Sequence, residues 1–304
     1  MRGDPPAPAD RDAHMDVTYR AARVEDLAAC LDLFQESVSD MRLRHNLPSR
    51  PQLDGAQRLE MYRHFLSTGI FHVAEADGRL VAFASAIVRQ HLWFLSGFWA
   101  LPGMQQRHIG MHLLRGVWDA GRHAGATTFF VWSSIDLPAM AAYMKVGMLP
   151  GSQILFLEGT PLLEAEAALG YVTELLRADL AGTLDETVLG IRRDMDHDLL
   201  IRSGWHARQV MHAGQAVGYY YVHDGTIGPA AWTDAAHASA LLTLACREAP
   251  AADSRLTLMI PGMNHAALRF GFDSGLRLTG FAHLLMSGPF GHLERYLPSG
   301  PGLF

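Results

Sequence analysis

Residues 101–114 read LPGMQQRHIGMHLL, and they join a strand-like segment at 92–101 to an amphipathic helix expected over 110–123. The N-terminus of a helix presents unpaired backbone N–H groups and the positive end of the helix dipole, so it binds phosphate oxygens well. Gly110 lets a ligand approach the backbone closely, and Arg107 adds positive charge. These features predict a pyrophosphate-binding turn, although a strand-to-helix turn with one glycine often has only a structural role.

Hydrophobic periodicity predicts alternating strands and helices on both sides of this turn. Asp77-Gly78, between two apolar runs, predicts a hairpin turn. In the first half we expect strands at 17–22, 70–76, 80–88, 92–101, 127–133 and 153–157, and helices near 27–34, 56–66, 110–123 and 138–146. In the second half we expect strands at 206–212, 216–223, 226–231, 256–260 and 277–286, and helices at 184–200, 234–247 and 264–270.

An internal repeat relates the two halves. One constant shift in residue number superimposes positions in two separate helices: Asp136 on Asn264, Ala139 on Ala267, Gly147 on Gly275, and Leu113-Leu114 on Leu241-Leu242. Agreement of two helices at one offset favours two copies of a mixed α/β unit. Chance similarity between two unrelated α/β domains is the alternative.

The composition limits the class of protein. The 304 residues are 49% hydrophobic and 18% charged, which is typical of a soluble protein with two domains. The net charge of −6 and the lack of a basic run argue against a nucleic-acid partner. Cys30 and Cys246 lie in apolar patterns and are expected to be buried thiols in a reducing compartment. Without an apolar run of about 18 residues or a signal peptide, we expect a cytoplasmic protein with no membrane partner.

The turn resembles the acyl-CoA site of the GNAT acyltransferase superfamily, which is marked by Q/R-x-x-G-x-G/A after a strand that ends in Pro. Gln105 and Gly110 match this motif after Pro102, while His108 occupies the position of the first glycine. The imidazole of His108 would either crowd the pyrophosphate or contact it. The resemblance implies that the strand, the turn and the first helical residues bind the cofactor: Phe98, Trp99, Ala100, Leu101, Gln105, Gln106, Arg107, His108, Ile109, Gly110 and Met111.

A second motif follows farther along the chain. The family pattern N-x-x-A-x-x-x-Y-x-x-x-G-F is similar to residues 136–148, DLPAMAAYMKVGM. Asp136 and Ala139 are then implied as cofactor contacts, with Asp136 capping the helix in place of Asn. Tyr143 would protonate the departing CoA thiolate. A plain core role for Tyr143 is the alternative for an isolated tyrosine on an apolar stripe.

The general base is harder to assign because the strand before the turn contains no carboxylate. His91, at the start of this strand, is the nearest titratable candidate, with His72 and Glu75 on the neighbouring hairpin. A structural role is the usual one for a single histidine on a strand. The 16 histidines do not form an H-E-x-x-H motif or another zinc-binding spacing, so we expect no metal.

The second half lacks the residues of the first site. The same shift places Thr233, Ala236 and Ala238 at the turn and Gly271 at the tyrosine. The resemblance therefore implies an α+β (mixed α/β) fold of two tandem GNAT-type domains, each a mostly antiparallel mixed sheet flanked by helices, with one active site. The predicted limits are a disordered leader at 1–16, the GNAT domain at 17–160, a connecting helix at 161–183, a degenerate GNAT-like domain at 184–290 and a tail at 291–304.

These features favour an N-acyltransferase that uses acetyl-CoA, or another acyl-CoA, to acylate a small-molecule amine by direct attack in a ternary complex. We expect a monomer or homodimer. Two alternatives remain: an inactive GNAT-fold module that binds CoA or another ligand, and an acyl-CoA enzyme with different chemistry, such as another acceptor or decarboxylation of a malonyl group.

Overall fold

The structure is a computed structural model that describes residues 16–47, 55–104, 108–164, 166–249 and 255–304. The expected leader lies outside these residues except for Asp16. The described helices include none that is long and apolar enough to span a membrane.

The first half follows the order expected from the periodicity, and Asp77 and Gly78 make the predicted hairpin turn with positive φ angles. Its elements are β1 (Val17–Ala21), α1 (Leu27–Arg44), α2 (Gly55–Thr68), β2 (Gly69–Ala76), β3 (Arg79–Arg89), β4 (Leu92–Ala100), α3 (Ile109–His123), β5 (Thr128–Ser133), α4 (Leu137–Lys145) and β6 (Leu149–Gly159).

The second half repeats this order, with its first three helices shorter than those of the first half. Its elements are β7 (Tyr171–Leu175), α5 (Ala178–Leu189), α6 (Asp194–Arg202), β8 (His206–His212), β9 (Gln215–His223), β10 (Thr226–Trp232), α7 (Ala238–Glu248), β11 (Leu256–Pro261), α8 (His265–Asp273), β12 (Arg277–Met286) and β13 (Tyr296–Leu297). Short 3-10 turns occur at Val24–Asp26, Ala235–His237 and Leu293–Arg295. The sequence repeat is confirmed here. The shift in residue number that places Asp136 on Asn264 also places the first and last residues of β5 on those of β11, and those of α4 on those of α8.

Two sequence predictions in this half are wrong. Residues 161–183 do not form one connecting helix, because residues 171–175 form β7, whose pairing with β8 overrides the helix propensity of the Leu/Ala/Glu-rich segment. The helix at 184–200 is instead α5 and α6, separated at Gly190, whose left-handed φ of 75° ends α5. The tail at 291–304 packs into the core, where Tyr296, Leu297 and Phe304 are buried.

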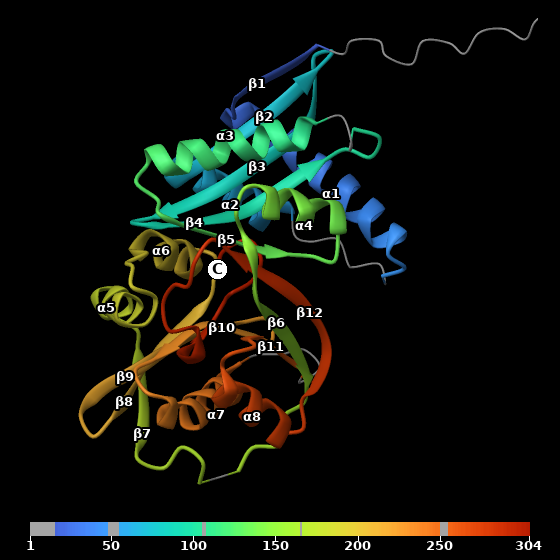
Figure 1. Ribbon diagram of the computed structural model, residues 1–304. Helices are drawn as coiled ribbons and strands as arrows, with labels where there is room; N and C mark the ends of the chain where they lie inside the picture. Colours follow the sequence, from blue (N-terminus) through green and yellow to red (C-terminus); the bar gives the residue numbers. More distant parts are fainter. Residues whose placement is uncertain (1–15, 48–54, 105–107, 165, 250–254) are drawn as a thin grey trace, which may run out of the picture.

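All strands form one sheet in which the two halves exchange their sixth strands (Figure 1). The strand order is β1-β2-β3-β4-β5-β12-β6-β11-β10-β9-β8-β7, with β13 paired to β10. Thus β12 of the second half pairs with β5 of the first, and β6 of the first half pairs with β11 of the second. Each half therefore completes the sheet of the other.

Helices cover both faces of the first half of the sheet. Successive residues of a strand point to opposite faces, and Phe98 lies against α3 whereas Trp99 packs on Phe34 of α1, with ring centroids 5.0 Å apart. Figure 1 shows α3 in front of β2, β3 and β4, with α1 and α2 behind them.

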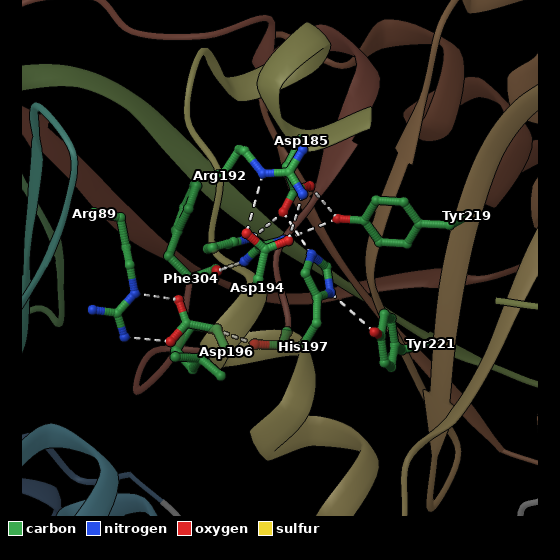
Figure 2. A network of polar contacts seen from close by, with 12 residues as sticks. Arg89, Asp185, Arg192, Asp194, Asp196, His197, Tyr219, Tyr221 and Phe304 are labelled. Atoms are coloured by element: carbon green, nitrogen blue, oxygen red, sulfur yellow. Dashed lines mark hydrogen bonds and ion pairs between the residues drawn. The ribbon is translucent and has the colours of Figure 1, made fainter. Parts of the chain in front are cut away.

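Buried ionic groups join the two halves. Asp196 of α6 accepts a hydrogen bond from Arg89 Nε of β3 at 2.8 Å and lies 2.7 Å from His64 Nε2 of α2. Figure 2 shows Asp196 and Arg89 beside a second cluster that contains Asp185 and His197. In this cluster Asp185 of α5 accepts hydrogen bonds from Arg193 Nε at 2.5 Å and from His197 Nε2 at 2.8 Å. All these side chains are almost fully buried, so removal of one member of an ion pair would leave a buried charge without its partner.

Candidate active site

The parallel strands β4 and β5 diverge at their carboxyl ends. They pair only between Leu92–Leu95 and residues 128–131. A bulge at Ser96 shifts the register of β4 against β3, and residues 97–100 then pair with β3 alone. Beyond Val131, β5 pairs on its other side with β12. The backbone edge of residues 97–100 therefore faces an opening and can pair with an extended ligand.

The turn after β4 leads directly to this opening. Of the cofactor contacts implied by the resemblance, Phe98, Trp99, Ala100 and Leu101 form its β4 side. Gln105, Gln106 and Arg107 lie outside the described residues. His108, Ile109, Gly110 and Met111 form the N-terminal turn of α3, and the side chain of the N-cap residue His108 makes no capping hydrogen bond.

His108 retains the backbone conformation that favours glycine. Its φ is 61° and its ψ is −1°, in the left-handed region, and its side chain is exposed. Gly110 is favoured for a different reason, since a Cβ there would lie 3.1 Å from the Phe98 ring and crowd it. Position 108 thus keeps a conformation that glycine favours although a histidine occupies it.

Tyr143 lies on the same side of the opening as Phe98, and their ring centroids are 5.7 Å apart. Burial, followed by the nearby negative charge of Asp136, raises the pKa of the Tyr143 phenol above its ordinary value. The phenol is consequently protonated at neutral pH and can donate a proton. Ala139 is one helical turn before Tyr143 and half-buried.

Asp136 does not cap α4 as the sequence predicted. Its side chain accepts no capping hydrogen bond, and Oδ2 lies 3.4 Å from an Arg44 nitrogen at the end of α1. This pairing draws the carboxylate away from the helix N–H groups. The contact joins residues 92 positions apart in the sequence, so no local pattern could have predicted it.

The proposed base residues are not brought to this opening. His91 precedes the opposite end of β4, about 17 Å from Ser96 at the rise of an extended strand, and lies beside Gly190. His72 lies beneath α3 against Gly116, and Glu75 binds Arg20 at 3.0 Å. These three residues therefore do not supply the general base that the strand itself lacks.

The sequence profile of the acetyltransferase (GNAT) family matches residues 31–148. This region contains β4, β5, the turn and Tyr143. Residues 31–148 are therefore similar to a GNAT domain. A comparison of the sequence with curated proteins found no match.

Solved structures extend the likeness to the whole chain. A proposed acetyltransferase from Pyrococcus horikoshii is 16% identical with a TM-score of 0.76, and the match covers 98% of this chain and 99% of that chain. The tandem GNAT protein from the clavulanic acid biosynthesis pathway is 14% identical with a TM-score of 0.59 over 90% and 99% of the two chains. A GCN5-related N-acetyltransferase from Sphaerobacter thermophilus is 15% identical with a TM-score of 0.59 over 89% and 95%. The α+β tandem GNAT fold predicted from the motifs is therefore confirmed.

In the second GNAT-like half, the chain itself fills the corresponding opening. β10 and β11 pair only at Thr226 and Ile227, and β13 then pairs with Ala230 and Ala231. Asn264, the counterpart of Asp136, caps α8 and donates a hydrogen bond from Nδ2 to the Tyr296 carbonyl at 3.0 Å.

The second turn is also satisfied internally. The carboxylate of Asp234 accepts a hydrogen bond from the backbone N–H of Ala236 at 2.8 Å. A carboxylate at that position repels phosphate.

Among the residues that the structure describes, no group of three His, Cys, Asp or Glu side chains is arranged to hold a metal ion.

Proposed function

We propose that the chain is an acyl-CoA-dependent N-acyltransferase that uses acetyl-CoA and acylates a small-molecule amine. The observation that carries this proposal is the opening between β4 and β5, which has an unpaired strand edge on one side and the buried, protonated Tyr143 beside it. The GNAT fold supports acyl-CoA-dependent transfer in general. The filled opening in the second half supports a single active site per chain.

In this proposal each element supports one part of the cofactor substrate. The N-terminal turn of α3 binds the pyrophosphate through its backbone N–H groups, with Arg107 adding positive charge. The edge of residues 97–100 pairs with the pantetheine amides, and a backbone N–H there stabilises the oxyanion of the thioester carbonyl. Acetyl is the acyl group proposed, because the family resemblance implies it.

The reaction is a direct attack in a ternary complex. The neutral amine nitrogen bonds to the thioester carbonyl carbon, and the C–S bond of the tetrahedral intermediate then breaks. Tyr143 gives its proton to the sulfur. The nitrogen, which is positively charged after the attack, loses a proton that restores the phenol. One further proton, removed from the ammonium before attack, leaves to solvent.

Two measurements test the proposal. Calorimetric titration with acetyl-CoA and CoA measures binding, and a thiol-reactive dye measures CoA release against a panel of amines. Binding of neither nucleotide would refute the proposal. Binding without CoA release on a broad panel would indicate an inactive ligand-binding module, and CoA release without an amine product would indicate different chemistry.

Substitution of Tyr143 tests its role as the acid. Tyr143→Phe should lower kcat by about 10²- to 10⁴-fold because it removes the proton donor, while acetyl-CoA affinity stays unchanged. Tyr62→Phe is the matched control, since Tyr62 is equally buried but packs in α2 against Phe71 and Phe83. An unchanged kcat in Tyr143→Phe would exclude the acid role.

A further inference from the structure

One arginine of α2 is half-buried without an anionic partner. Arg58 makes no hydrogen bond or ion pair with another residue that the structure describes, and its guanidinium lies over the ring of Phe34 in α1, 4.5 Å from the ring centroid. Other buried or half-buried arginines are paired: Arg20, Arg89 and Arg193 each bind an aspartate. Arg58 therefore carries a positive charge that the described residues do not neutralise.

The surroundings of Arg58 leave this charge available to a ligand. Burial lowers the pKa of its guanidinium, whereas a hydrogen bond to Asp26 raises the pKa of Arg20. The two arginines differ because no carboxylate compensates Arg58 for the water that it has lost. The guanidinium is still protonated at neutral pH. A partly desolvated charge attracts an anion more strongly than a charge in bulk water does.

The position of Arg58 in α2 places it on the face of the sheet opposite α3 (Figure 1). Phe34 connects it to the opening, because the Phe34 ring packs edge-to-face on Trp99 with centroids 5.0 Å apart. Trp99 belongs to the β4 edge, residues 97–100, that we propose to pair with the cofactor. Tyr143 and α3 lie on the other face of this edge. An amine therefore reaches the thioester from the side of Trp99 and Arg58.

Residues 302–304 form a second wall beside Arg58. A Cβ at Gly302 would lie 3.9 Å from Nη1 of Arg58. Two residues later, Phe304 packs on Phe130 of β5, with ring centroids 4.9 Å apart. This segment thus runs from the guanidinium to the strand on the far side of the opening, so both halves of the chain contribute to the acceptor side.

The ligand that fits Arg58 is a single carboxylate on a carbon chain. The planar guanidinium can donate two parallel N–H bonds to a carboxylate. A phosphate dianion needs further positive charge, and no second cation is among the groups that act on Arg58 in the described part of the chain. The rings of Phe34 and Trp99, between Arg58 and the opening, suit the hydrocarbon stem that would join the carboxylate to the amine.

From these contacts we infer that Arg58 binds a carboxylate of the acceptor, so that the substrate class is an amino acid. This inference rests on the proposed function and narrows the small-molecule amine to one that carries a carboxylate. The amine group lies at the opening between β4 and β5, and the carboxylate lies between α1 and α2. The role of Arg58 is to bind and orient the acceptor.

The test compares each amino acid with its own amide, which keeps the amine and removes the negative charge. The acceptors are glycine, β-alanine, γ-aminobutyrate, leucine and phenylalanine, and the measured quantity is the ratio of kcat/KM for the acid to kcat/KM for its amide. In Arg58→Met this ratio should fall by about 10- to 100-fold from its wild-type value, as expected for loss of a charged hydrogen bond. The comparison with wild type removes the intrinsic difference in amine pKa between acid and amide.

Two further variants complete the design. Arg63→Met is the matched control, since Arg63 is exposed on the same helix and pairs with Glu60 at 3.3 Å, and it should leave the ratio unchanged. Arg58→Lys keeps the charge and loses the planar fork, so its ratio should lie between those of wild type and Arg58→Met. It also tests the inference if Arg58→Met does not fold. All three variants should bind acetyl-CoA as the wild type does.

The contrary outcomes separate the inference from the proposed function. An unchanged ratio in Arg58→Met would overturn the inference, and so would an equal loss with acid and amide, which indicates only packing against Phe34. A loss of acetyl-CoA affinity would place Arg58 at the cofactor and overturn it. A wild type that prefers phosphoethanolamine to every acid, or that acylates only amines without an anionic group, would overturn it and leave the proposed function standing. A wild type that acylates no amine would overturn both.

Discussion

His108 shows how one residue can depart from a motif while the backbone keeps its shape. A non-glycine residue in the left-handed region costs about 1–2 kcal/mol, and the surrounding turn holds His108 there with its side chain exposed. The sequence left open whether the imidazole obstructs a pyrophosphate or contacts it. The exposed position of the ring favours a turn that binds phosphate through its backbone.

We therefore predict that His108→Gly stabilises the chain by up to about 1 kcal/mol and does not weaken acetyl-CoA binding, because the backbone is already in a conformation that glycine prefers. Thermal unfolding and calorimetric titration measure the two effects. Asp77→Gly is the control, because Asp77 also has a positive φ, of 51°, but lies in the β2–β3 hairpin and not in the turn before α3. A large loss of CoA affinity in His108→Gly would mean that the imidazole itself binds the phosphate.

At the scale of elements, the two openings of the sheet are used differently. In the first half residues 97–100 of β4 pair with β3 alone, whereas in the second half β13 pairs with the equivalent part of β10 and Asp234 binds a backbone N–H of the turn. The second copy of the fold thus fills its opening with its own chain.

Helices α5 and α6 and strand β9 are joined through Asp185. Burial alone would raise the pKa of this carboxyl, but Arg193 and His197 outweigh burial and lower it to about 2. Asp185→Asn should destabilise the chain by about 3–5 kcal/mol at neutral pH, because it leaves Arg193 buried without its partner. Denaturant unfolding measures this difference.

The pH dependence follows from the lowered pKa of Asp185. An unfolded carboxyl titrates near pH 4, so the stabilisation is complete above that pH and is lost as the pH falls toward about 2. The difference in free energy of unfolding between wild type and Asp185→Asn should decrease over this pH range. Asp179→Asn, at an exposed ion pair with Arg177, should show no such difference at any pH. A constant difference for Asp185→Asn would contradict the prediction.

At the scale of the whole molecule, the exchanged strands make the two halves dependent on each other. The sequence predicted domains at 17–160 and 184–290, but β5 of the first region pairs with β12, and β6 pairs with β11. A cut after Gly159 separates strands from their partners on both sides and exposes the edge of β5. It also divides Arg89 from Asp196.

We predict that fragment 16–160 does not fold alone and that co-expression with 161–304 restores a complex that binds acetyl-CoA. Circular dichroism, size-exclusion chromatography and calorimetric titration measure folding, assembly and binding. As a control, cleavage of the full chain within 161–164 after folding should leave the complex intact, because no strand is interrupted there. A soluble fragment 16–160 with a cooperative unfolding transition would contradict the prediction.

The sequence by itself determined what depends on near neighbours. Periodicity and turn residues located most helices and strands, the constant offset between Asp136 and Asn264 revealed the repeat, and two motifs placed the opening and Tyr143. Only the tertiary structure decided the exchange of β6 and β12, the insertion of β13 and the approach of Arg44 to Asp136. Such contacts join distant residues, whose pairing depends on the competition among all buried surfaces and hydrogen-bonding groups at once. For the turn that we propose to bind pyrophosphate, the sequence located the residues, and the fold placed His108 in a backbone conformation that glycine favours.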